Sequence, residues 1–323
     1  MNKLLYIVLL IFTLVIVSCT GSLEEIDYNK NTNPLSQNSW TQATASANWS
    51  ARRTHASVVF DNKLWIIGGY ESGYKNDVWY TTNGITWTQA TANANWSPRT
   101  ELVSMAYNNK IWVIGGNGGT DKNDVWYSED GIIWTQATAS ANWSARSAHT
   151  CVVFDNKMWL IGGMNNSSST RNNDVWYSVD GITWTQATAS ANWTARYWQT
   201  SVVFDNKIWV IGGWDASGYK NDVWYSADGI TWTQATSNAT WTGRAYYTSV
   251  VFNNRIWILG GLDNDGLNND VWYSGNGITW TQSTAIVNWI ARYCFRSEVY
   301  DNKIWILGGY DTVNNFRDVW YIY

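Results

Sequence analysis

Hydrophobic positions in this chain come in short runs that end at turn residues. In the first clear example, SVVF (57–60) and KLWII (63–67) flank the pair Asp61-Asn62. Two further runs, DVWY (77–80) and ITWTQA (85–90), flank Asn83-Gly84. Val, Ile, Trp and Tyr suit a pleated strand, and Asp-Asn and Asn-Gly tolerate the positive φ of a tight hairpin. No segment longer than a turn has a helical period, so the pattern predicts four antiparallel strands.

The same four-strand unit recurs along the chain. A Gly-Gly doublet follows the second strand of every copy, at 68/69, 115/116, 162/163, 212/213, 260/261 and 308/309. Copies of four strands at a spacing of 47 to 50 residues are typical of propeller blades. The sequence therefore predicts an all-β fold over residues 39–323, a six-bladed β-propeller of four-stranded antiparallel blades.

The two ends of the repeat region complement each other. The last copy stops at Tyr323, after its third strand, whereas SWTQAT (39–44) is a fourth-strand segment with no copy before it. We expect this N-terminal strand to close the last blade as its outermost strand.

The repeat resembles the kelch motif, in which a hydrophobic run ends in Gly-Gly and a Tyr and a Trp follow, separated by six residues. The pairs at that spacing are Tyr80/Trp87, Tyr127/Trp134, Tyr177/Trp184, Tyr225/Trp232 and Tyr273/Trp280. The resemblance covers 39–323 and implies a kelch-type propeller. Its relatives include copper-radical galactose oxidases, which gather two histidines and several tyrosines at one metal. His55 and His149 are here separated by a blade, so we expect no metal and no cofactor.

Comparison between the copies separates scaffold from site, because whatever every blade needs to fold recurs in all six. Of the 26 tryptophans, all but Trp198 and Trp214 occupy recurring positions, and we assign those to packing. An arginine recurs at 52, 99, 146, 196, 244 and 292, and an aspartate at 77, 124, 174, 222, 270 and 318. Since an unpaired buried charge is too costly to repeat, we expect Arg–Asp pairs. The alternative is a sialidase-like arginine cluster that binds a carboxylate.

The copies differ mainly in the loops of one face. The fourth-to-first connections and the second-to-third loops share this variable loop face, and the two hairpins of each blade lie on the opposite face. Aromatic residues gather on it in copies four to six, as at an interaction site. The candidate ligand-binding residues are Tyr197, Trp198, Trp214, Tyr219, Tyr246, Tyr247, Tyr293 and Phe295. We expect Trp198 and Trp214 to be neighbours at the channel mouth; the alternative is drift in exposed loops.

One charged pair departs from the repeat near the expected channel. Glu298 replaces a hydrophobic position, and Arg296 precedes it by two residues on the same strand face. We expect an ion pair. The alternative is a general base in a carbohydrate-active enzyme, because six-bladed kelch proteins include a sialate mutarotase. Cys151 and Cys294 fall in different blades, which argues against a disulfide.

The N-terminal segment predicts export. Lys3 precedes the hydrophobic run Leu4 to Val17, which is short for a membrane-spanning helix and ends at Cys19 in a sequence that resembles the bacterial lipoprotein box. We expect a lipoprotein signal peptide at 1–18, lipidation of Cys19 and a flexible tether at 19–38. The protein would then be anchored to the bacterial cell envelope, with the outer membrane or the cell surface favoured. The alternative is an ordinary signal peptide with an incidental cysteine.

These patterns together favour a binding module. The net charge of −4 argues against a nucleic-acid partner, and no residue is assigned a catalytic role. The expected ligand is a glycan or a protein on the variable loop face, and the membrane is expected to be contacted through the lipid anchor alone. The alternatives are a sialate mutarotase-like enzyme and a structural or adhesive surface lipoprotein.

Overall fold

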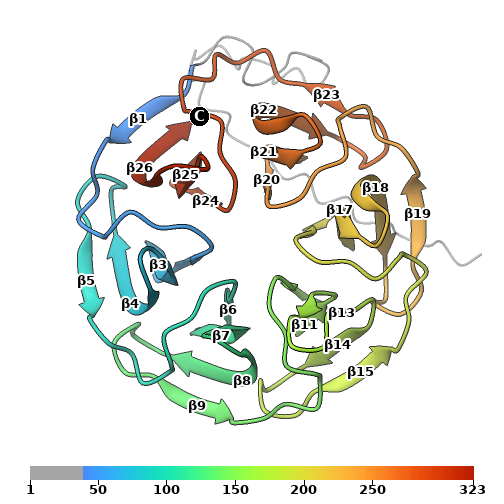
Figure 1. Ribbon diagram of the computed structural model, residues 1–323, viewed down its shortest axis with the longest axis horizontal. Coiled ribbons are helices and arrows are strands. Elements are labelled where there is room, and N and C mark those ends of the chain that lie inside the picture. The colour runs from blue at the N-terminus through green and yellow to red at the C-terminus, as the bar shows by residue number, and fades with distance from the viewer. Residues whose placement is uncertain (1–38) are drawn as a thin grey trace, which may run out of the picture. The chain divides into compact units, whose positions relative to one another are not determined.

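The computed structural model describes residues 39–323, which form a ring of six four-stranded antiparallel sheets around a central axis (Figure 1). The predicted signal peptide, Cys19 and the tether lie outside the described residues. Among residues 39–323, no helical segment has the length and hydropathy needed to span a bilayer. The predicted six-bladed propeller is confirmed.

Each blade adds its strands in order from the axis outward. The first strands, which contact one another around the axis, are β2 (Ala56–Phe60), β6 (Val103–Tyr107), β10 (Thr150–Phe154), β16 (Thr200–Phe204), β20 (Thr248–Phe252) and β24 (Arg296–Tyr300). The second strands are β3 (Lys63–Tyr70), β7 (Lys110–Asn117), β11 (Lys157–Ile161), β17 (Lys207–Asp215), β21 (Arg255–Asp263) and β25 (Lys303–Tyr310).

The outer strands complete the sheets. The third strands are β4 (Tyr74–Thr81), β8 (Asp121–Ser128), β14 (Val175–Ser178), β18 (Gly218–Ser226), β22 (Gly266–Ser274) and β26 (Asn315–Ile322). The fourth strands are β5 (Thr88–Thr91), β9 (Thr135–Thr138), β15 (Thr185–Thr188), β19 (Thr233–Thr236), β23 (Thr281–Gln282) and β1 (Thr41–Thr44). A short extra ribbon in the third blade pairs β12 (Met164–Asn165) with β13 (Thr170–Arg171).

The N-terminal strand closes the last blade, as the sequence predicts. β1 pairs antiparallel with β26, Thr41 opposite Tyr321, in the sheet β1-β26-β25-β24. Beside it, the Trp40 amide donates to the Ile286 carbonyl at 3.1 Å, and Asn288 Nδ2 donates to the Trp40 carbonyl at 3.1 Å. The first residues of the described chain therefore bind both the fifth-to-sixth connection and the last strand.

The two turns of a blade differ from each other. Asp61 and Asn62 have φ of 49° and 51°, which confirms the predicted tight hairpin. At the second turn the expected strand start at Ile85 is wrong, because β5 begins at Thr88. Asn83 Oδ1 accepts hydrogen bonds from the amides of Ile85 (2.9 Å) and Thr86 (3.0 Å), so these amides cap the turn and do not join the ladder.

The hydrophobic core lies between blades, and Gly84 of the second turn shows how closely neighbouring blades pack. Each hydrophobic cluster combines residues of neighbouring blades; one joins Trp65 of the first blade to Leu102 and Ile111 of the second. Gly84 has φ of 74°, and a Cβ there would lie 2.1 Å from the Trp305 ring of the sixth blade. The glycine of the turn is therefore required by the tryptophan of the preceding blade.

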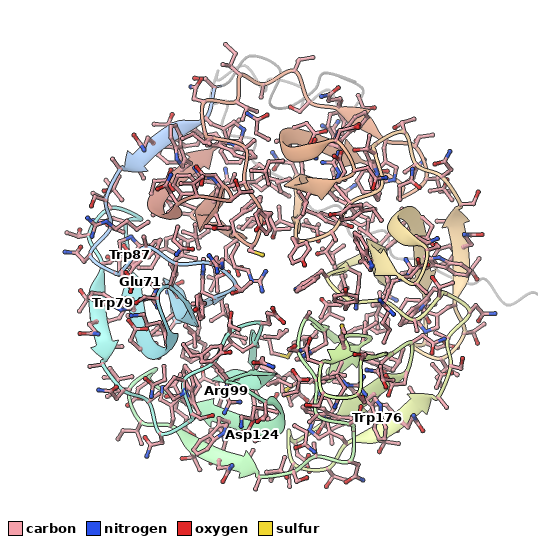
Figure 2. The ribbon with its side chains drawn as sticks, in the orientation of Figure 1. Glu71, Trp79, Trp87, Arg99, Asp124 and Trp176 are labelled. Carbon is pink, nitrogen blue, oxygen red and sulfur yellow. The ribbon has the colours of Figure 1, made fainter. Side chains whose placement is uncertain are left out.

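The recurring charges pair one for one, as expected. All six arginines lie within 2.5–2.7 Å of the aspartate of their own blade. In the second blade, shown in Figure 2, Arg99 donates from Nη1 and Nη2 to Asp124 at 2.6 and 2.8 Å and also to Gly115, to the Ser97 carbonyl and to Ser97 Oγ. Every donor direction of this buried guanidinium is used, so these arginines are scaffold residues.

Candidate functional site

Six residues with left-handed backbone surround the axis on the variable loop face. They occupy the second position after the scaffold arginine of each blade, with φ between 50° and 59°: Thr54, Glu101, Ala148, Trp198, Tyr246 and Cys294. In five cases the backbone amide of one of these residues donates a hydrogen bond of 2.9 to 3.3 Å to the backbone carbonyl of the equivalent residue in the adjacent blade. Such φ values are unusual for non-glycine residues. These six residues are called the axial ring below.

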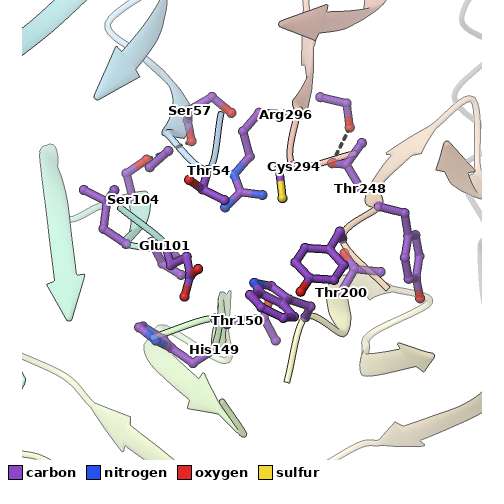
Figure 3. Close-up of a pocket in the computed structure, with 18 of the residues that line it drawn as sticks. Thr54, Ser57, Glu101, Ser104, His149, Thr150, Thr200, Thr248, Cys294 and Arg296 are labelled. Carbon is purple, nitrogen blue, oxygen red and sulfur yellow. Dashed lines mark hydrogen bonds between the residues drawn. The ribbon is translucent and has the colours of Figure 1, made fainter. Parts of the chain in front are cut away.

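The axial ring surrounds the mouth of a cavity of about 150 Å³ to which all six blades contribute. Its lining combines hydroxyls (Thr54, Ser57, Ser104, Thr150, Thr200, Thr248) with ionisable groups (Glu101, His149, Cys294, Arg296, Glu298). Figure 3 shows Arg296 and Glu101 reaching into this cavity from the sixth and the second blade, which both adjoin the first. The channel of the propeller is therefore a polar cavity with charged groups in it.

An arc of aromatic rings follows one side of the mouth. It comprises Tyr197, Trp198, Tyr246, Tyr293, Tyr310, Tyr70 and Tyr74. The Trp198 and Tyr246 rings stack with centroids 3.6 Å apart, Tyr197 lies 4.6 Å from Trp198, and Tyr293 lies 5.4 Å from Tyr246 and 5.6 Å from Tyr310. Arg53 bridges the rest of this aromatic arc, with its guanidinium 4.2 Å from the Tyr310 ring and 5.0 Å from the Tyr70 ring.

Four of the candidate residues are thus brought together: Tyr197, Trp198, Tyr246 and Tyr293, all partly exposed. Trp214 and Tyr219 form a separate edge-to-face pair at 4.3 Å. Trp214 is joined to the arc through the backbone, because it exchanges hydrogen bonds of 2.9 and 3.1 Å with Tyr197. Trp198 and Trp214 therefore lie at the same rim, while their indoles pack on different tyrosines.

Tyr247 and Phe295 lie in the core between blades. Phe295 is fully buried, and Tyr247 is 4% exposed. Each packs on the first glycine of the preceding blade, and the Tyr247 hydroxyl donates to the Ile211 carbonyl at 2.5 Å. Only Tyr247 borders the cavity. A direct ligand contact of these two residues stays a prediction.

The expected ion pair between Arg296 and Glu298 is not formed. Glu298 instead accepts a hydrogen bond of 2.7 Å from Ser57 Oγ of the first blade. Burial raises the pKa of Glu298 to about 7, against the opposing effects of the Ser57 hydroxyl and the Arg296 charge. The pairing with Ser57 follows from the contact between the first strands of adjacent blades.

Glu101 is a second acid with an unusual environment. Burial raises its pKa to about 7, and the Asp121 carboxylate adds to the effect, whereas a hydrogen bond from Ser147 and the charge of Arg296 oppose it. Two carboxyl groups of the cavity thus titrate near neutrality. Such groups exchange protons or switch charge at physiological pH.

The histidines and cysteines do not form a metal site. His55 and His149 are buried, with lowered pKa values caused mainly by burial. Within residues 39–323, no group of three or more His, Cys, Asp and Glu residues could hold a metal ion. Cys151 and Cys294 are free thiols.

Sequence reasoning did not single out five residues of the mouth: Arg53, Tyr70, Tyr74, Tyr310 and Glu101. A signal was available, since Tyr70 and Tyr310 directly follow the Gly-Gly doublet, in the position of Trp214. Glu101 occupies the position of Trp198 in the second copy. Comparing the same repeat position in all six copies would therefore have identified these residues as candidates.

Comparison with known proteins agrees with this geometry. A search of curated proteins finds no match to the chain. The family model described as the KLHDC2/KLHL20/DRC7 Kelch-repeats domain matches residues 25–163 and 148–323. These two segments cover most of the chain, and the described part of it has the six blades that the kelch motif predicts. The chain therefore belongs to the kelch-repeat family.

Proposed function

We propose that this kelch propeller is a binding module whose partner is a protein, and that a segment of the partner lies on the aromatic arc at the channel mouth. Kelch propellers generally mediate protein interactions. The observation that carries the proposal is the continuity of the arc across blades four, five, six and one, since aromatic side chains dominate the energetics of protein interfaces.

The arc is suited to an extended polypeptide. Its rings are already packed on one another, so little side-chain entropy is lost when a ligand binds. Tyrosine and tryptophan offer both apolar faces and hydrogen-bonding groups to a ligand. A glycan stacked on the same rings is the alternative ligand.

A peptide selection tests the proposal. A displayed library of random peptides is selected on the immobilised full chain, and affinities are measured for the enriched peptides. Trp198→Ala and Tyr293→Ala should each weaken binding about tenfold or more, as interface hot spots do. Ile230→Ala, a change of an exposed side chain on the opposite face, is the matched control. Enrichment of no peptide, together with Trp198-dependent binding on a glycan array, would replace the protein partner with a glycan.

An enzyme is the second candidate because Glu298 lines the cavity and its pKa is raised to about 7. That value suits a general base, as a sialate mutarotase-like activity requires. Exchange between sugar anomers, followed by NMR, should then be catalysed by the wild type and abolished in Glu298→Gln. No acceleration over buffer with a sialic acid panel would remove this candidate.

We further propose that the module is exported and anchored to the cell envelope through Cys19. The hydrophobic segment Leu4 to Val17 followed by Cys19 supports this. Metabolic labelling with a fatty acid should mark the wild type and not Cys19→Ser. Equal labelling of both would contradict the anchor.

A further inference from the structure

Arg296 interrupts a series of small residues on the inner strands. At its position in the repeat the other blades carry Ala56, Val103, Thr150, Thr200 and Thr248. The three threonines each share a hydrogen bond with a serine of the next blade, at 2.5 to 2.7 Å. In the sixth blade no threonine is present for this bond, and Ser57 donates to Glu298 instead. Arg296 therefore does not take over the structural role of its position.

The hydrogen bonding of Arg296 also differs from that of the scaffold arginines. Those six each bind an aspartate through two nitrogen atoms and donate to backbone carbonyls as well. The Arg296 guanidinium makes a single long hydrogen bond in the described part of the chain, 3.4 Å from Nη1 to the Phe295 carbonyl, and no ion pair there. Most of its donors thus have no partner in the described chain and are left available to a ligand in the cavity.

We propose that the channel cavity is a binding site for a carboxylate monoanion, and that the Arg296 guanidinium is its bidentate donor. A planar fork of N–H groups matches the two oxygen atoms of a carboxylate. The surrounding hydroxyls of Thr54, Ser57 and Thr200 line the same cavity and can supply further donors. The inference deepens the proposed function and rests on it, since the carboxylate would be the part of the ligand that reaches below the aromatic arc.

The cavity favours a monoanion over a phosphate dianion. Glu101 and Glu298 line it together with Arg296, so a second negative charge on the ligand would meet two acidic groups and one guanidinium. The cavity of about 150 Å³ has room for a group of this size. A carboxylate therefore fits both the charge and the volume of the cavity.

Anion binding should be linked to proton uptake. The titratable or charged groups that line the cavity are Glu101, His149, Tyr246, Tyr247, Cys294, Arg296 and Glu298. Burial lowers the pKa of His149 to about 3 and raises those of Cys294, Tyr246 and Tyr247, so these four stay neutral near pH 7. The two glutamates have pKa values of about 7, and below that value they repel an anion less and can donate to it. Above about pH 7, affinity should fall by up to about tenfold per pH unit for each proton taken up.

The test uses the full chain in a mild detergent, with acetate as the probe and acetamide as its neutral isostere. Binding is followed by saturation-transfer NMR titration at fixed ionic strength. Acetate should bind and acetamide should not, Arg296→Gln should weaken acetate binding about tenfold or more, and Glu298→Gln should flatten the pH dependence. Arg255→Gln, which changes an arginine stacked on Tyr273 at the outer hairpin face, is the control and should bind like the wild type.

Several outcomes overturn the proposal: equal binding of acetate and acetamide, an Arg296→Gln variant that binds acetate like the wild type, or preference for inorganic phosphate. If Arg296→Gln does not fold, Arg296→Lys keeps the charge without the fork. It should bind acetate more weakly than the wild type and still prefer it to acetamide, and the loss of that preference would count against the site. Tyr293→Ala removes a ring that does not line the cavity, so it should weaken peptides and leave acetate binding unchanged. Failure of the acetate site and failure of the protein-binding proposal are thereby distinguished.

Discussion

Closure of the ring by the N-terminal strand can be measured through one side chain, Trp40. It is 1% exposed and packs edge-to-face on Trp289 with centroids 6.0 Å apart. Trp87 is its counterpart in the first blade, 4% exposed and edge-to-face on Trp49 at 5.8 Å. Neither indole nitrogen has a hydrogen-bond partner in the described chain. The two sites are therefore closely alike, and the main difference is that Trp40 directly precedes β1, a strand from the far end of the sequence.

The expected loss of stability follows from the buried area. An indole that buries 150–250 Å² at about 25 cal/mol/Å² contributes roughly 4–6 kcal/mol as an upper estimate. Measured Trp→Ala changes in protein cores cost about 3–5 kcal/mol. Trp40→Ala and Trp87→Ala should therefore each lower the free energy of unfolding by about 3–5 kcal/mol, by similar amounts.

The assay is guanidinium unfolding followed by both far-UV circular dichroism and fluorescence, with coincidence of the two transitions required before free energies are compared. If the closing strand were weakly docked, it would detach in Trp40→Ala and limit the loss to the free energy of docking. A loss below about 1 kcal/mol in Trp40→Ala, beside the full loss in Trp87→Ala, would refute closure by this strand.

Three further predictions concern the scaffold and the cavity. Asp222→Ala leaves buried Arg196 without its partner and should destabilise the fold by about 3–5 kcal/mol in the same unfolding assay. The pKa of Asp222 is lowered despite its burial, because Arg196 donates hydrogen bonds to it, so this stabilising contribution should be lost as pH falls below about 4. A difference in stability that does not depend on pH would contradict this reasoning. Gly84→Ala should destabilise by about 1–3 kcal/mol or more, because its Cβ would meet Trp305, whereas Gly73→Ala has no atom within 4 Å and should be nearly neutral. Because the pKa of Glu298 is raised, its contribution to stability is complete below the ordinary pKa of 4.5 and is lost as pH rises through about 7. Glu298→Gln should therefore raise the melting temperature above pH 7 and change it little in acid. An equal shift of the melting temperature at both pH values would contradict the raised pKa.

The repeat made the architecture predictable because the same turn and strand residues recur in every blade. Asp-Asn pairs, Gly-Gly doublets and a missing fourth strand were enough to give the hairpins, the blade number and the closing strand. The start of β5 was missed because side-chain capping by Asn83 competes with the strand ladder. That competition cannot be recognised from hydrophobic alternation.

The contacts at the axis were less predictable, because they join equivalent positions of different blades. Arg296 and Glu298 are neighbours on one strand face, and the sequence favoured pairing them. The hydroxyl that donates to Glu298 belongs to Ser57 of the next blade, which the packing of adjacent first strands brings close. In the same way, Trp198 stacks on Tyr246 across a blade boundary and not on Trp214 of its own blade.

The distribution of departures from the repeat gives the strongest reason to place function at the axis. Identical residues at equivalent positions would produce a six-fold symmetric channel, whose walls cannot discriminate between the different sides of an asymmetric ligand. The outer tryptophans and the Arg–Asp pairs keep this symmetry in every blade. Symmetry is broken at the channel by Glu101, Trp198, Tyr246, Arg296 and Glu298, which come from four different blades and line one cavity. Near neutral pH an unpaired guanidinium and two carboxyl groups with raised pKa values lower stability, so their concentration at the axis favours a ligand-binding role for this cavity.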